Sequence, residues 1–62
     1  MFSENLIRLR TNEGITQDDM AKSMKLSRSV IAKWESGRGL PNTKNLIELS
    51  KRFNVSIETL IQ

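Results

Sequence analysis

Apolar side chains recur at helical spacing along the whole chain, and turn residues divide them into five short segments. No stretch alternates apolar and polar residues as a strand would, so the pattern predicts an all-α fold. In the first segment, Leu6 and Leu9 are expected to face inward. We expect this helix to begin at Ser3, whose hydroxyl can accept a hydrogen bond from a free backbone N–H. It ends between Asn12 and Gly14, because glycine adopts the left-handed conformation that closes helices at little steric cost.

A second helix is indicated by the segment that follows Ile15, where Thr16 is a good N-cap. Asp19 lies three residues later and can reach back to the Thr16 backbone as in a capping box. The buried stripe of this helix is expected to consist of Met20, Ala21 and Met24.

A third helix follows after a tight turn through Lys25 and Leu26, with Ser27 as its N-cap. Ile31 and Trp34 share its inner face, and it ends at residues 36–37. Two short helices joined by a three-residue turn should cross steeply, which predicts a helix-turn-helix over residues 16–36.

The rest of the chain predicts two more helices. After a loop over residues 38–41, Asn42 or Thr43 caps a fourth helix, and a short fifth helix runs from Ser56 to Ile61. The inward positions of the fourth helix are Leu46, Leu49 and Phe53. We therefore expect residues 1–62 to form a single domain, a compact five-helix bundle.

Length and composition exclude several classes of protein. A chain of 62 residues without cysteine or histidine has neither disulfides nor the usual zinc ligands, so packed helices must supply its stability. We expect no metal site, no cofactor and no enzymatic activity, because the Asp18–Asp19 pair lies in a first helical turn without a converging base. No leader or long apolar run is present, which favours a cytoplasmic protein without a membrane partner.

Positive charge is concentrated in the middle of the chain. Ten Lys and Arg against seven Asp and Glu give a net charge of +3. Between residues 22 and 38 five residues are basic and only Glu35 is acidic. An anionic partner and a merely solvated basic face both fit this distribution.

The segments TQDDMA at residues 16–21 and LSRSVIAKWESG at residues 26–37 resemble the Cro-like, or XRE, family of phage and bacterial repressors. Leu40–Pro41 and residues 53–60 are similar to the last two helices of that family. The resemblance implies a lambda-repressor-like domain in a sequence-specific regulator of transcription, expected to be a repressor. Its partner would be double-stranded DNA, with the helix over residues 27–36 in the major groove.

The resemblance also assigns roles to individual residues. Gln17, at the start of the second helix, would bind a phosphate. The expected base contacts are Arg28, Ser29 and Lys33, with looser roles for Ser27 and Ala32. Further phosphate contacts are expected from Arg38, Asn42, Thr43 and Lys44. Each of these side chains could instead be a solvated surface residue.

Three residues have structural roles by the same resemblance. Arg10 and Glu35 would form a partly buried ion pair beneath the third helix, which stabilises the fold without reading sequence. Lys25 stands where many relatives have glycine, so we expect it to adopt a positive φ at a cost of about 1 kcal/mol.

A homodimer is expected, because one recognition helix reads too few base pairs for useful specificity. The fifth segment is apolar, and its candidate dimer contacts are Ile57, Leu60 and Ile61. These side chains could equally complete the core of one copy.

Two further alternatives remain open from the sequence. The same fold could serve as a protein-interaction module, such as an antitoxin-like or bridging factor. Because the chain stops directly after the fifth helix at Gln62, it fits both a complete protein and a DNA-binding domain whose C-terminal domain has been removed.

Overall fold

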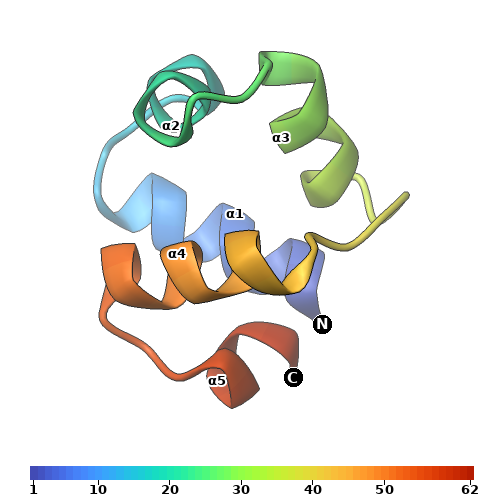
Figure 1. Cartoon of the computed structure of the whole chain (residues 1–62). Helices are drawn as coiled ribbons and strands as arrows, with labels where there is room; N and C mark the ends of the chain where they lie inside the picture. Colours follow the sequence, from blue (N-terminus) through green and yellow to red (C-terminus); the bar gives the residue numbers. More distant parts are fainter.

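The computed structural model describes residues 1–62 and confirms the all-α fold with five helices. In chain order these are α1 (Phe2–Asn12), α2 (Gln17–Met24), α3 (Arg28–Glu35), α4 (Thr43–Phe53) and α5 (Ile57–Ile61). Figure 1 shows α2 and α3 at one end of the molecule and α5 at the other, with α1 and α4 between them. None of the helices has the length and apolar character needed to cross a membrane.

Side-chain caps begin four of the helices where the sequence predicted them. Thr16 accepts a hydrogen bond from Asp19 N at 3.0 Å, and Asp19 Oδ2 accepts one from Thr16 N at 3.2 Å, which completes the capping box. These two bonds hold the pKa of the Asp19 carboxyl below its ordinary value, and the bond from the Thr16 backbone has the larger effect. Ser27, Asn42 and Ser56 likewise accept a backbone N–H three residues later, so the fourth helix is capped by Asn42 and not by Thr43.

The start of α1 differs from the sequence prediction. The helix begins at Phe2, and Met1 takes the N-cap position without a side-chain bond, so Ser3 is not the cap. Phe2 is 3% exposed and meets Trp34 edge-on, with ring centroids 6.4 Å apart at an interplanar angle of 74°. Packing of this aromatic pair accounts for a helix start two residues earlier than predicted, with Met1 in place of Ser3 at the N-cap. Ser3 is buried, and local capping preferences do not predict this.

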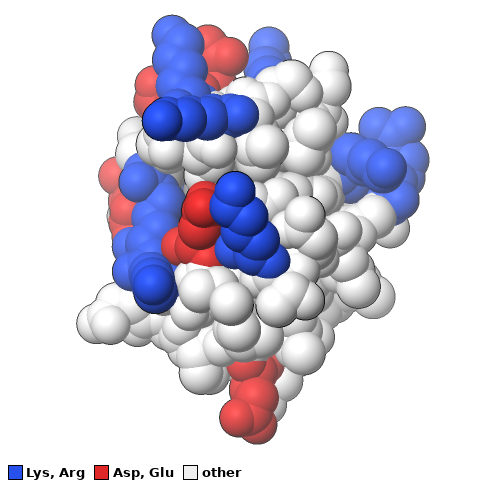
Figure 2. All heavy atoms as spheres, viewed as in Figure 1, with Lys and Arg blue, Asp and Glu red and all other residues white.

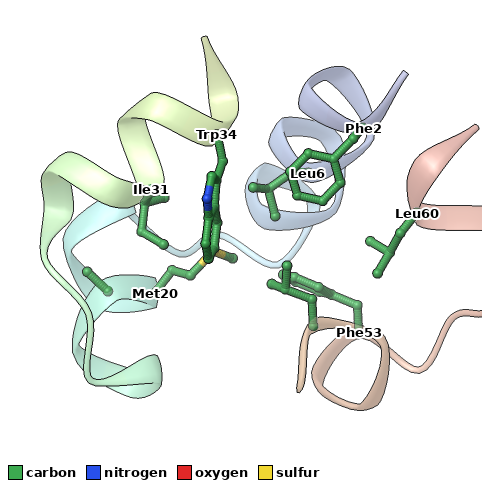
Figure 3. Close-up of a cluster of buried hydrophobic side chains, with 9 residues drawn as sticks. Phe2, Leu6, Met20, Ile31, Trp34, Phe53 and Leu60 are labelled. Atoms are coloured by element: carbon green, nitrogen blue, oxygen red, sulfur yellow. The ribbon is translucent and has the colours of Figure 1, made fainter. Parts of the chain in front are cut away.

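The core is a cluster of nine buried side chains drawn from all five helices: Phe2, Leu6, Met20, Ala21, Ile31, Trp34, Leu49, Phe53 and Leu60. Figure 3 shows Trp34 standing between Met20 and Ile31 on one side and Leu6 and Phe2 on the other. Burial of Ala21 lets α2 approach α3 closely, as expected for a steep crossing. Leu9, Met24 and Leu46, also predicted to face inward, are half-buried against this cluster.

A polar side chain that the sequence analysis did not single out holds α5 in place. Asn5 is buried on α1, and its Nδ2 donates to the carbonyls of Thr59 at 3.1 Å and Leu60 at 2.9 Å. A helix of five residues cannot persist alone. Asn5 and the buried Leu60 therefore attach it to α1, where the Met1 ammonium also donates to the Gln62 carbonyl.

Lys25 adopts the left-handed conformation, with φ 58° and ψ 40°, as expected from the turn. Lys25→Gly should stabilise the domain by about 1 kcal/mol, because glycine relieves the steric cost of that conformation. Urea unfolding at a fixed pH measures the difference. Asn54→Gly is the matched control: Asn54 is also left-handed, with φ 55°, but asparagine tolerates this region, so its gain should be smaller. Equal gains at both positions would contradict strain at Lys25.

Candidate nucleic-acid interface

Two helices and the turn between them form the helix-turn-helix, α2 and α3. Lys25 reverses the chain, the N–H of Leu26 donates back to the Ala21 carbonyl at 2.9 Å, and Ser27 caps α3. Ile31 and Trp34 anchor the inner face of α3 in the core, so its rotation about its own axis is set. The opposite face must therefore point to solvent.

That outer face carries the residues expected to contact bases. Arg28, Ser29 and Lys33 are exposed on α3, and so is Ser27 at its N-cap, whereas Ala32 is half-buried. The structure thus leaves all four polar candidates exposed on α3 or at its N-cap.

The residues expected to contact phosphates fall into two groups. Gln17 lies half-buried at the first position of α2, and the others follow α3, where all are exposed: Arg38, Asn42, Thr43 and Lys44. Two of these have intramolecular bonds, since Arg38 Nε donates to Ser36 Oγ at 2.9 Å and Asn42 Oδ1 caps α4. Thr43 and Lys44 occupy the first turn of α4, where free backbone N–H groups also lie.

A polar cleft of about 440 Å³ joins the start of α2 to the start of α3. It is lined by Arg10, Thr16, Gln17, Asp18 and Arg28. Two arginines and a helix N-terminus favour an anion there, while Asp18 opposes it. The cleft is therefore suited to one phosphate held by directed bonds more than by net charge.

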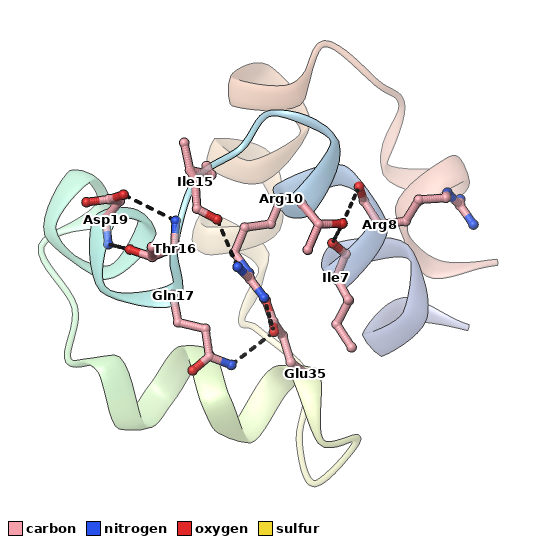
Figure 4. A network of polar contacts seen from close by, with 9 residues as sticks. Ile7, Arg8, Arg10, Ile15, Thr16, Gln17, Asp19 and Glu35 are labelled. Atoms are coloured by element: carbon pink, nitrogen blue, oxygen red, sulfur yellow. Dashed lines mark hydrogen bonds and ion pairs between the residues drawn. The ribbon is translucent and has the colours of Figure 1, made fainter.

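Beneath this cleft the expected pair of Arg10 and Glu35 is present (Figure 4). Arg10 Nε donates to Glu35 Oε2 at 2.6 Å and Arg10 Nη2 to Oε1 at 3.0 Å, a bidentate arrangement. The side chains are 14% and 5% exposed, and hydrogen bonding to Glu35 raises the pKa of Arg10 above its ordinary value. Arg10 Nη1 also donates to the Ile15 carbonyl at 2.8 Å, so the pair ties α1 to the chain entering α2.

Sequence analysis missed a third member of this network, Gln17. Its Nε2 donates to Glu35 Oε1 at 3.0 Å, so the carboxylate that neutralises Arg10 also orients the side chain expected on a phosphate. The two residues are 18 positions apart, and neither the capping box nor the third-helix pattern relates them. Only the steep crossing of α2 and α3 brings them together.

Charge is mixed over the surface. Figure 2 shows basic side chains at the upper left, where α2 lies, across the middle, where α4 lies in Figure 1, and at the right edge, with acidic side chains beside several of them. Lys22 and Asp18 are one example of neighbouring opposite charges: both are exposed, and Lys22 Nζ lies 4.0 Å from Asp18 Oδ2. No continuous basic patch covers this face of the molecule.

Comparison with known proteins settles the family. The chain matches the family described as Helix-turn-helix over residues 6–60, which covers α2, α3 and α4 completely and most of α1 and α5. The chain belongs to this helix-turn-helix family. It is of the XRE type, as the resemblance in residues 16–37 implied.

Several curated relatives carry the same helix-turn-helix domain. The HTH-type transcriptional activator BcrR of Enterococcus faecalis is 45% identical over 60 residues, 97% of this chain and 29% of that protein. The uncharacterized HTH-type regulator YqaE of Bacillus subtilis is 36% identical over 62 residues, 100% of this chain and 53% of that protein. The transcriptional repressor RstR of the cryptic phage CTXphi in Vibrio cholerae is 35% identical over 59 residues, 95% of this chain and 53% of that protein.

The helix-turn-helix domain therefore spans only part of these relatives, between 29% and 53% of their length. What it shares with them is the domain of DNA-binding transcription regulators, and neither the family nor these names point to an enzyme. No solved structure gives a significant match.

Glu35→Ala is expected to lower the free energy of unfolding by about 3 kcal/mol, because it leaves the guanidinium of Arg10 partly buried without its partner. Urea unfolding of the variant tests this. The matched control is the double variant Arg10→Met with Glu35→Leu, in which apolar groups replace both charges. Its free energy of unfolding should fall by less than that of Glu35→Ala. A double variant less stable than Glu35→Ala would show that the pair is not what stabilises this site.

Proposed function

We propose that this helix-turn-helix domain reads a specific sequence in double-stranded DNA by placing α3 in the major groove. The observation that carries the proposal is the division of α3 into two faces. Ile31 and Trp34 are at most 4% exposed in the core, while Arg28 and Lys33 are exposed to solvent. A guanidinium can bond guanine O6 and N7 together, so Arg28 is the strongest candidate for a base contact.

The N-terminus of α2 would fix the register by binding a phosphate. Gln17 is oriented by Glu35 through one N–H of its amide, which leaves its second N–H for a phosphate oxygen. Backbone N–H groups of the first turn and the side chains of Arg10 and Arg28 line the same cleft. A phosphate contact at this point positions α3 without carrying sequence information.

The domain would act as a homodimer on an inverted repeat. Ile61 is 50% exposed at the end of α5, whereas Ile57 is half-buried. Leu60 is fully buried in the core of one copy, which corrects its inclusion among the candidate dimer contacts. Ile61 borders an apolar pocket of about 310 Å³ that also reaches Trp34 and Leu40 beside the C-terminal end of α3. A two-fold contact here would leave both α3 helices free to reach grooves roughly 34 Å apart.

The direction of regulation stays a prediction. The relatives include one named as an activator and one named as a repressor, so the same DNA-binding domain serves both. Repression is proposed from the family resemblance in the helix-turn-helix.

Selection of bound duplexes from a random pool should enrich an inverted repeat whose half-sites lie about 10 base pairs apart. Arg28→Ala should relax the preference at one base pair per half-site by roughly 5- to 150-fold, because a bidentate base contact is lost. Sequencing the bound fraction at one fixed salt concentration measures both effects.

Lys44→Ala is the matched control, since removal of a phosphate contact on this exposed position should weaken all duplexes alike and reduce the salt dependence of binding. Enrichment of no sequence by the wild-type chain would overturn the proposed reading of DNA. A protein-interaction module would then be the better explanation.

Ile61→Glu tests the dimer. A buried carboxylate in an apolar contact is costly, so binding to the inverted repeat should weaken at least tenfold, about 1.4 kcal/mol, while binding to one isolated half-site is retained. Gel-shift titration with both duplexes makes the comparison. Glu58→Gln, on an exposed position of the same helix, should change neither. Equal losses on both duplexes would contradict a dimer contact at Ile61.

A further inference from the structure

The side chain of Lys33 lies across Gly39, in the loop that follows α3. A Cβ placed at residue 39 would be 2.8 Å from Lys33 Cε, 3.5 Å from its Nζ and 3.6 Å from its Cδ. These three atoms, all from Lys33, are the nearest neighbours of that position. The absence of a side chain at residue 39 therefore provides the space in which the end of Lys33 lies.

The backbone at Gly39 does not itself require glycine. Gly14 and Gly37 have positive φ values of 70° and 79°, a region that L-residues rarely adopt, but Gly39 has no positive φ. Alanine at residue 39 would therefore meet no backbone strain. Its only close contact would be with the flexible end of Lys33.

The loop is held against Lys33 by bonds to the backbone of that same residue. The Lys33 carbonyl accepts one hydrogen bond from the Arg38 backbone N–H at 3.1 Å and another from the Ser36 hydroxyl at 2.9 Å. Arg38 Nε in turn donates to Ser36 Oγ at 2.9 Å. Gly39, next along the chain, is thus kept at a set position relative to the lysine whose side chain crosses it.

We propose that Gly39 determines specificity by positioning Lys33 for its base contact. A lysine side chain is long and flexible and its ammonium is an undirected donor, so it discriminates bases poorly unless its path is restricted. The space over Gly39, in which the end of the Lys33 side chain lies, restricts that path before DNA is bound. Gly39 is a positioning residue in this scheme and touches no base itself. The inference rests on the proposed DNA-reading function, in particular on the base contact of Lys33.

Gly39→Ala in the 62-residue chain should relax the base preference that depends on Lys33 while leaving the fold intact. Selection from the random duplex pool should show Lys33→Ala losing preference at one base pair by roughly fivefold or more. Gly39→Ala should lose preference at the same base pair by roughly threefold or more, because the displaced ammonium samples several positions. The urea midpoint should not change, since only a flexible side chain has to move.

The double variant Gly39→Ala with Lys33→Ala separates action through Lys33 from action of the loop itself. Its preference should equal that of Lys33→Ala alone, because there is no longer a lysine to position. Additive losses would overturn the proposal and assign Gly39 an independent effect on the loop. An unchanged preference in Gly39→Ala would also overturn it.

Failure of this inference can be distinguished from failure of the proposed function. If the wild-type chain enriches a sequence but Lys33→Ala changes nothing, DNA reading stands and the role of Gly39 is refuted. If no sequence is enriched, both are refuted. Should Gly39→Ala unfold, nuclear Overhauser contacts between the Lys33 ε-protons and the Gly39 α-protons in the wild-type chain decide the point: their presence supports this position of the Lys33 side chain, and their absence overturns it.

Discussion

The carboxylate of Glu35 is the contact on which the arrangement of the reading surface depends. It lies on α3 but binds Arg10 of α1 through two oxygens and Gln17 of α2 through one. A bidentate pair is directional as well as attractive, so it limits how α3 can roll or slide on α1. With nine buried side chains in the core and no cysteine or histidine, the domain has few other means of setting this geometry.

Placing this ion pair beneath the interface connects stability to recognition. The residue that would bind a phosphate, Gln17, takes its orientation from Glu35, and the proposed base-reading side chains occupy the face of α3 opposite Trp34. Glu35 thereby connects α3 to the start of α2 through Gln17, and to α1 through the Arg10 ion pair, whose side chains are only slightly exposed. Such a contact is screened by salt much less than a surface pair, so the geometry persists where contacts to DNA phosphates weaken.

The sequence predicted whatever depends on neighbouring residues. Four caps and the capping box at Thr16 follow from side chains within a few positions of each other. The left-handed conformation of Lys25 is expected from the family resemblance. The start of α1 could not be predicted in this way, because Phe2 is drawn into the helix by Trp34. The bonds from Asn5 to α5, from Gln17 to Glu35 and from the loop to Lys33 also eluded local analysis. Each depends on how two helices cross, or on how a loop folds back.

For the candidate site, sequence analysis identified the residue types but not their arrangement. Adjacent apolar residues on a helix point in directions about 100° apart, so only one of Leu60 and Ile61 could be buried deeply. Which one is buried depends on the roll of α5, and Asn5 sets that roll by binding the carbonyls of Thr59 and Leu60. Which apolar residue is exposed at the end of α5 thus depends on Asn5, whose bond to Leu60 spans 55 positions of the chain.

The low net charge fits the proposed reliance on directed contacts and on a second copy. A net charge of +3, with acidic side chains between the basic ones, gives only modest attraction to any duplex. Asp18 in the phosphate cleft weakens that attraction further. Weak general binding raises the ratio of specific to non-specific affinity, provided that the base contacts are well positioned. In the proposed function, restricted side chains such as Gln17 on Glu35 and Lys33 on Gly39 would let a domain with so little net charge discriminate between sequences.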